Sequence, residues 1–131
     1  MLTLKAIDHV GLRVSDMEKT LHFYQQLGLA LLRASGPAAD GRRAAVIQVG
    51  NQEINLVSRP EFVPSEENKH AGIDHFCLQV EAASFDDVIA DLQRAGIDIG
   101  KGAEQRRDGT SVYLHDPDGV RVELLLKNAM A

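Results

Sequence analysis

Residues 7–14 read IDHVGLRV, and residues 73–80 read IDHFCLQV. Both strings alternate between polar and apolar residues, as a half-buried β-strand does, and each carries a histidine at the same position. The two histidines, His9 and His75, lie 66 residues apart. The repeated string therefore predicts that the chain is an internal duplication.

The repeat continues beyond the first string. Asn55 and Glu123 stand at matching places in two later apolar segments, 68 residues apart. A two-residue insertion near residues 81–83 accounts for the difference between the two offsets. Duplicated modules bury their faces against each other, so a pseudo-twofold axis should bring His9 beside His75 and Asn55 opposite Glu123.

The composition is that of an average globular domain. The chain has 131 residues, 44% of them hydrophobic and 25% charged. A net charge of -5 and the lack of any long run of Lys or Arg argue against a nucleic-acid partner. We find no signal-peptide pattern and no apolar run long enough to span a bilayer, which predicts a cytoplasmic protein with no membrane partner. The single cysteine, Cys77, cannot form an internal disulfide.

Hydrophobic periodicity places the remaining elements. Alternation over residues 5–14 sends His9 and Arg13 to one face of the first strand, and the apolar residues to the other face, where a helix should pack. Helical spacing predicts helices over 16–27 and 85–95, ended by Gly28 and Gly96. Three strands should follow each helix, at residues 29–34, 43–49 and 53–58, and then at 97–101, 110–115 and 120–126.

These elements predict an α+β fold made of two tandem βαβββ modules within a single domain, residues 1–131. The modules cover about residues 5–58 and 73–126. The segment 59–72 between them is polar and broken by prolines. It is long for a connection in a compact domain, and long loops often serve as lids or binding loops.

Several of these strings together resemble the vicinal oxygen chelate superfamily. The strings are the Asp-His openings, the turn YLHDPDG at 113–119 and the strand VEL at 122–124, and the resemblance extends over about residues 5–126. This superfamily includes glyoxalase I, extradiol dioxygenases, fosfomycin-resistance proteins and bleomycin-binding proteins. Residues 54–56 and 61–64 further resemble a small subgroup of glyoxalase-domain-containing proteins. The resemblance implies a cupped mixed sheet around a cavity that holds a metal ion.

The same resemblance puts the superfamily's metal ligands at His9, Asn55, His75 and Glu123. Asn55 departs from the pattern, because glyoxalase I carries a glutamate there and uses it in proton transfer. The remaining two His and one Glu form an open set of ligands that suits Fe or Mn, with Ni, Co and Zn as further candidates. Such a site leaves positions at which a substrate with two adjacent oxygens can chelate the ion.

The residues themselves favour this assignment for Glu123. It lies in a nearly continuous apolar strand, and a buried carboxylate costs several kcal/mol unless it is paired or coordinated. Tyr113 precedes Glu123 by ten residues, the spacing of an active-site tyrosine in the extradiol dioxygenases, so we predict a catalytic role, with simple packing as the alternative. Four further residues are predicted to bind substrate: Asn55, Cys77, Arg13 and Gln48.

Three functions remain open from the sequence. The first is a metal-dependent enzyme, a glyoxalase-like lyase or isomerase or an extradiol-type dioxygenase, that acts on a small molecule with vicinal oxygens. The second is a metal-dependent transferase that resembles the fosfomycin-resistance enzymes. The third is a metal-free binding protein that resembles the bleomycin-resistance proteins, which lack the ligand residues present here. Small members of the superfamily usually dimerise, so we expect a homodimer.

Overall fold

The computed structural model describes residues 3, 7–62 and 75–128. The chain divides into two compact units, Met1–Ser65 and Glu66–Ala131, which we call the first and the second unit. The described residues form two helices and eight strands, with one βαβββ module in each unit. The predicted α+β fold with two modules is therefore confirmed, and the boundary between the units falls inside the predicted connecting segment 59–72.

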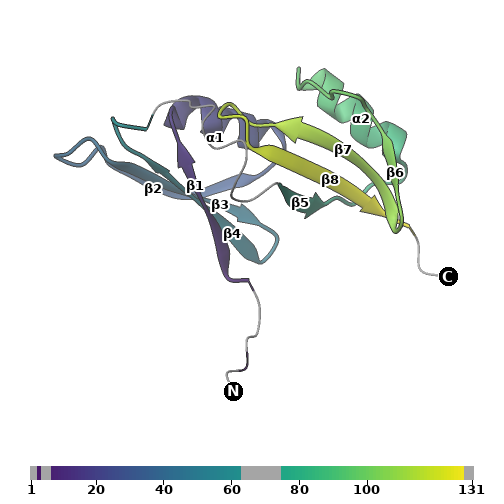
Figure 1. Cartoon of the computed structure of the whole chain (residues 1–131), viewed down its shortest axis with the longest axis horizontal. Helices are drawn as coiled ribbons and strands as arrows, with labels where there is room; N and C mark the ends of the chain where they lie inside the picture. The colour runs from purple at the N-terminus through teal and green to yellow at the C-terminus, as the bar shows by residue number, and fades with distance from the viewer. Residues whose placement is uncertain (1–2, 4–6, 63–74, 129–131) are drawn as a thin grey trace. The chain divides into compact units, whose positions relative to one another are not determined.

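The first unit holds one four-stranded mixed sheet and one helix (Figure 1). Its elements are β1 (His9–Val14), α1 (Met17–Gln26), β2 (Ala30–Ser35), β3 (Arg43–Val49) and β4 (Gln52–Ser58). The strand order is β1-β4-β3-β2. Strand β1 runs parallel to β4, and the other neighbours are antiparallel.

The second unit repeats this topology. Its elements are β5 (Phe76–Gln79), α2 (Phe85–Arg94), β6 (Glu104–Arg106), β7 (Gly109–His115) and β8 (Arg121–Lys127). The strand order is β5-β8-β7-β6, with β5 parallel to β8. The duplication in the sequence is thus a duplication of strand order and strand direction.

Both helices begin at a side-chain cap and end at a glycine. The carboxylate of Asp16 accepts a hydrogen bond from the Lys19 amide at 3.1 Å, and the hydroxyl of Ser84 accepts one from the Asp87 amide at 3.3 Å. Gly28 follows α1 with a positive φ of 91°, which lets the chain turn out of the helix. Among the described residues, we find no helix with the length and apolar composition that a membrane crossing requires.

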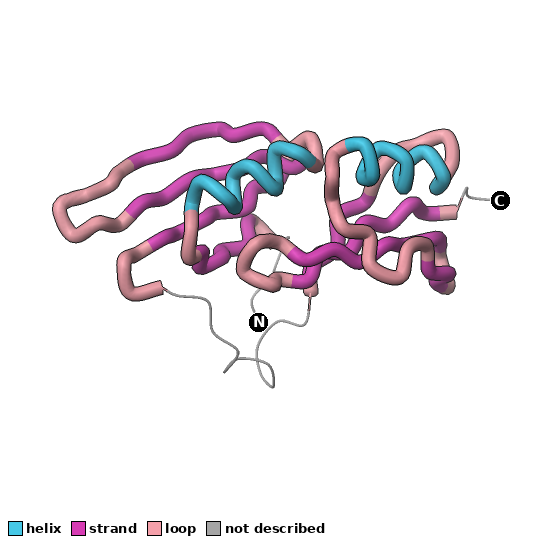
Figure 2. Tube along the Cα trace, turned by 90° about the horizontal axis from the view of Figure 1, so that it is seen from above, coloured by secondary structure: helices cyan, strands magenta, loops and turns pink. Residues whose placement is uncertain are grey.

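In each unit the helix lies along one face of the sheet (Figure 2), and buried apolar side chains of the helix and the strands form the core. In the first unit this core includes Tyr24 of α1 and Leu56 of β4, and in the second it includes Leu92 of α2 and Leu114 of β7. Exposure alternates along β1 as the sequence predicts, from exposed His9 to the buried last residue of the strand. The opposite face of each sheet carries the polar candidates for the site.

One predicted strand is wrong. Residues 97–101 form irregular backbone that ends in a turn, and the strand on this side of the second unit begins only at Glu104. The carboxylate of Asp98 accepts a hydrogen bond from the Gly100 amide at 2.8 Å, which closes a side-chain turn. A second turn follows, because the Gly102 amide donates to the Ile99 carbonyl at 2.8 Å. The other predicted helices and strands agree with the structure to within a few residues at each end.

Candidate metal and substrate site

His75 and Glu123 meet on the polar face of the second unit. Glu123 lies in the central strand β8, and His75 directly precedes the edge strand β5. The His75 Nε2 atom lies 3.1 Å from the Glu123 Oε1 atom. The other carboxylate oxygen, Oε2, accepts a hydrogen bond of 2.6 Å from the hydroxyl of Ser111 on β7. Glu123 is therefore held from two sides.

This arrangement explains how the sheet tolerates a carboxylate in its interior. Glu123 is only 8% exposed, and an ion buried to that extent is costly unless polar groups replace the lost water. Ser111 replaces water at one oxygen and His75 at the other. Since the neighbouring strand positions Val122 and Leu124 belong to the core, alternation directs Glu123 to the face opposite the helix.

The strand register brings two more predicted residues beside Glu123. Cys77 on β5 and Tyr113 on β7 are its direct partners on the two neighbouring strands. The rings of His75 and Tyr113 meet edge to face, with their centroids 6.0 Å apart. The second unit thus gathers four of the predicted site residues on one face of its sheet.

Cys77 is a weak nucleophile in this setting. Partial burial of its sulfur, and to a lesser extent the nearby negative charge of Glu123, raise the pKa of Cys77 to about 11. The thiol therefore stays protonated at neutral pH, although its side chain is exposed at the surface of the unit. This favours a contact role for Cys77 over a reactive one.

Two arginines lie against the ring of Tyr113. The sequence did not indicate either of them as a site residue. The guanidinium carbon of Arg106, on β6, lies 4.8 Å from the ring centroid, and that of Arg121, on β8, lies 4.1 Å from it. Arg121 and Glu123 are two residues apart on one strand, so both project from the same face. Alternation along β7 and β8 could have indicated Ser111 and Arg121, because each lies two residues from a predicted site residue.

The equivalent positions on the sheet of the first unit carry less polar residues. Asn55 on β4 is paired with Gly11 on β1 and with Val46 on β3, the positions that Cys77 and Tyr113 occupy in the other unit. The Oδ1 atom of Asn55 is buried and has no hydrogen-bond partner among the described residues. A neutral amide with an unsatisfied oxygen therefore stands where the second unit has a carboxylate with two partners.

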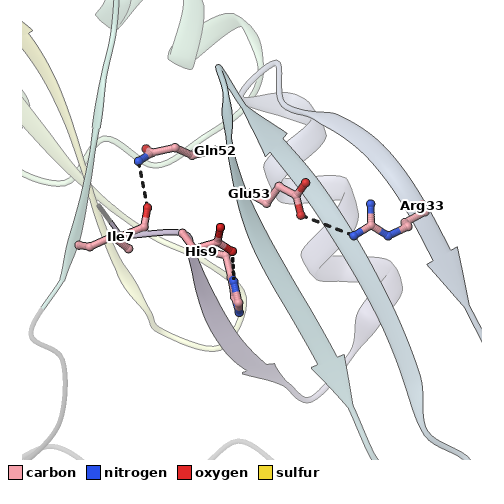
Figure 3. Close-up of polar contacts among 6 residues, drawn as sticks. Ile7, His9, Arg33, Gln52 and Glu53 are labelled. Atoms are coloured by element: carbon pink, nitrogen blue, oxygen red, sulfur yellow. Dashed lines mark hydrogen bonds and ion pairs between the residues drawn. The ribbon is translucent and has the colours of Figure 1, made fainter. Parts of the chain in front are cut away.

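His9 is oriented by its neighbour in the sequence. Its Nδ1 atom lies 2.8 Å from the Oδ2 atom of Asp8 (Figure 3). A carboxylate oxygen accepts, so Nδ1 is the donor of this hydrogen bond, and Nε2 is the ring nitrogen left for another partner. Strand β1 begins at His9, so Asp8 lies outside the regular strand, and alternation does not turn its side chain away from His9.

Arg13 and Gln48 are engaged within the first unit. The guanidinium carbon of Arg13 lies 5.7 Å from the centroid of the Phe62 ring. The Gln48 side-chain amide donates to the Gly50 carbonyl at 3.0 Å, next to the turn that joins β3 to β4. Substrate binding by these two residues stays a prediction.

The chemistry of His75 and Glu123 fits a metal ion. Two atoms that each bind one ion at about 2.1 Å lie roughly 3 Å apart, which matches the 3.1 Å between Nε2 and Oε1. Imidazole nitrogen and carboxylate oxygen also suit the first-row divalent metals. In the described part of the chain, no three His, Cys, Asp or Glu side chains are grouped so that they could hold a metal. His9 belongs to the first unit and His75 and Glu123 to the second, so their convergence stays a prediction.

Known proteins are similar to this chain in both sequence and fold. The family described as "Glyoxalase/Bleomycin resistance protein/Dioxygenase superfamily" matches residues 6–124. The virulence protein STM3117 of Salmonella typhimurium is 32% identical over 94% of this chain and 85% of its own length. The glutathione transferase FosA of Serratia marcescens is 29% identical, over 92% of this chain and 80% of FosA. The crystal structure of a glyoxalase family protein from Enterococcus faecalis superposes with a TM-score of 0.73 at 26% identity, over 92% of this chain and 97% of that one. The chain therefore belongs to the glyoxalase, bleomycin resistance protein and dioxygenase superfamily, which is the vicinal oxygen chelate family that its repeated strings resemble.

Proposed function

We propose that this protein is a metal-dependent enzyme that acts on a small substrate with two adjacent oxygens. The ion would be Fe, Mn, Ni, Co or Zn, bound by His9, His75 and Glu123. The observation that carries this proposal is the approach of His75 Nε2 to Glu123 Oε1 at 3.1 Å. The buried carboxylate is fixed by Ser111 in the orientation that a ligand needs.

The hydrogen bond from His9 to Asp8 supports the same proposal. Histidines that bind metals usually donate their second ring nitrogen to a carboxylate or carbonyl, which fixes the tautomer and turns the other nitrogen to the ion. His9 has this arrangement, with Nδ1 on Asp8 and Nε2 left for another partner. Glu123 is supported in a similar way by Ser111.

In the proposed enzyme a bound ion supplies Lewis acidity for a substrate that chelates it through both oxygens. The residues of the chain then have separate tasks. Tyr113 lies beside Glu123 and makes a T-shaped ring contact with His75, where its hydroxyl can move a proton to or from the substrate. Asn55 provides an amide oxygen that can accept a hydrogen bond from a substrate hydroxyl, because its Oδ1 is buried and has no partner among the described residues. Cys77, the partner of Glu123 on β5, contributes a contact surface.

A lyase or isomerase of the glyoxalase type and an extradiol-type dioxygenase are the two leading forms of this proposal. A carboxylate base at position 55, which the glyoxalase I pattern expects, is replaced by an amide. A transferase is the second candidate function, and one observation favours it: the resemblance to the glutathione transferase FosA extends over 92% of the chain at 29% identity. In that case a thiol would be the second substrate.

Metal analysis tests the common core of these proposals. Protein purified without a chelator should carry one divalent ion per chain, measured by plasma mass spectrometry. His75→Ala and Glu123→Ala should each weaken the affinity for Mn²⁺ at least about tenfold, since each removes one ligand. His9→Ala should do the same.

His22→Ala is the matched control, because His22 lies exposed on α1, and it should leave the metal content unchanged. Circular dichroism should report a folded chain for all four variants. A wild-type protein that retains none of the five metals under reducing and non-reducing conditions contradicts the proposal. Activity is then assayed on metal-loaded protein with the hemithioacetal of methylglyoxal and glutathione, with a catechol and oxygen, and with fosfomycin and a thiol.

A further inference from the structure

Ser111 holds one oxygen of Glu123 in the interior of the second unit. The hydrogen bond from its hydroxyl to the Glu123 Oε2 atom is 2.6 Å long, within the range of charge-assisted bonds to a carboxylate. The Ser111 side chain is fully buried, so bulk water does not compete for its hydroxyl. Breaking this bond would leave a buried hydroxyl without its partner, which makes the contact costly to give up.

The two oxygens of Glu123 are engaged from opposite sides of its strand. Strand β8 lies between β7, which carries Ser111, and β5, which His75 directly precedes. Ser111 is the diagonal neighbour of Glu123 across the two strands, because its own partner in the register is Leu125. Oε2 is therefore held on the β7 side, whereas Oε1 lies 3.1 Å from the His75 Nε2 atom on the β5 side.

These contacts leave one oxygen of Glu123 for a metal ion. An ion bound by both His75 and Glu123 must lie close to Nε2 and therefore beside Oε1. Some carboxylates bind an ion through both oxygens. For Glu123 to do so, Oε2 would have to turn toward the same ion, and this turn would break the hydrogen bond from Ser111.

The number of metal-binding oxygens decides how many positions of the ion stay open. An octahedral ion such as Mn²⁺ has six positions. Two histidines and a glutamate bound through one oxygen occupy three of them, whereas a glutamate bound through both oxygens occupies a fourth. A substrate that chelates through two oxygens takes two more positions. Only the first arrangement then leaves a position for a second small reactant.

We propose that Ser111 is a positioning residue that restricts Glu123 to one metal-binding oxygen and thereby keeps a coordination position open for a second reactant. The ion itself comes from the proposed function, on which this inference rests. The open position favours the two forms of the proposed enzyme that join a second reactant to the substrate, the dioxygenase and the transferase. An isomerase needs the substrate alone.

The number of water molecules on bound Mn²⁺ tests the role of Ser111. Water proton relaxation, measured with all of the Mn²⁺ bound to protein, reports how many exchangeable waters each ion holds. Wild type should hold about three, the positions that the protein leaves on an octahedral ion. Ser111→Ala frees Glu123 to bind through both oxygens, so it should hold about two, and the relaxation enhancement per ion should fall by about one third.

Two further variants make the test specific to the Ser111 hydroxyl. Ser111→Thr keeps a hydroxyl at this place and should retain the wild-type value. Thr110→Ala removes a hydroxyl from the preceding residue of β7, which alternation directs to the other face of the sheet, and it should leave the value unchanged. Circular dichroism checks that each variant is folded.

The outcomes separate this inference from the proposed function. If wild type binds Mn²⁺ but holds only about two waters, or if Ser111→Ala binds Mn²⁺ with the wild-type value, the role of Ser111 is wrong and the metal-dependent enzyme stands. An equal fall in Thr110→Ala has the same meaning. A wild type that binds no Mn²⁺ overturns both. Because the wild-type value alone can contradict the inference, the test does not depend on the folding of Ser111→Ala.

Discussion

At the scale of single residues, the two units differ in chemistry at one pair of equivalent positions in the middle of their sheets. Glu123 and Asn55 occupy the same place in the strand register of their units. Glu123 has Ser111 and His75 as partners, whereas the Asn55 Oδ1 atom has none among the described residues. The duplication therefore preserved the backbone position while the chemistry of the side chains diverged.

This difference leads to a prediction for Asn55. Because the amide offers no carboxylate base, wild type should turn over the hemithioacetal of methylglyoxal and glutathione poorly. Asn55→Glu adds a strong oxygen ligand and should tighten metal retention at least about tenfold. It should also shift the preference of the site toward Zn or Ni and create weak glyoxalase activity. Equilibrium dialysis and a spectrophotometric assay measure these effects.

Asn55→Gln is the control for size, since it adds the same length without the charge and should not tighten metal retention. Robust glyoxalase activity of the wild type, lost only on changes at His9, His75 or Glu123, would contradict this prediction. Another group would then supply the base, and Tyr113 is the first to test, by Tyr113→Phe.

At the scale of elements, the sequence predicted most of the fold because caps and glycines mark the ends of its helices. Asp16 and Ser84 cap α1 and α2, and the predicted glycines Gly28 and Gly96 follow the two helices with positive φ. The strand at 97–101 was wrong because alternation cannot detect the side-chain turn closed by Asp98. Local pattern is reliable where one face is buried and fails where a short polar side chain captures a backbone amide.

The site was less predictable than the elements, for a reason that lies in the sheet. The alternation of side chains along a strand predicts which face Glu123 and His75 occupy. The residues that lie beside them on other strands depend on the register between the strands. That register places Ser111 within 2.6 Å of Glu123 and brings Arg106 from the edge strand onto Tyr113. Contacts across strands join residues far apart in the chain, and no local pattern records them.

Gly109 tests how tightly the register of β7 and β8 is set. A Cβ atom at Gly109 would collide with the backbone of Leu126 and Lys127 on β8. Gly109→Ala should therefore lower the free energy of unfolding by about 1–3 kcal/mol, as overpacking does. Urea unfolding of the metal-free protein measures this change.

Gly11 is the matched control, since it is also a strand glycine and a Cβ atom there would meet no atom of the described residues within 4 Å. Gly11→Ala should change the unfolding free energy by no more than about 0.5 kcal/mol. If both substitutions shift the urea midpoint equally, close approach of the two strands is not what requires glycine at position 109.

At the scale of the whole molecule, the duplication predicts that a first unit and a second unit form the site together. It does not predict whether these two units belong to one chain or to two. His9 lies in one unit and His75 and Glu123 in the other, so a complete set of ligands needs either both units of one chain or units from two chains. We propose a homodimer, and light scattering should report about twice 14.3 kDa. A monomer at micromolar concentration contradicts it.

Mixing two inactive variants distinguishes the two ways of pairing. His9→Ala and Glu123→Ala chains, each unable to hold metal alone, are unfolded together and refolded in equal amounts. If sites form between chains, a mixed dimer has one site with all three ligands and one that lacks two, so about a quarter of all sites should bind Mn²⁺ again. Pairing within a chain restores none, because every site then lacks a ligand.

The matched control is a mixture of His75→Ala with Glu123→Ala chains. Both substitutions lie in the second unit, so no arrangement of units yields a complete site and no metal should return. The separation of 3.1 Å between His75 and Glu123 predicts that both bind the same ion. Recovery in this control would contradict that prediction.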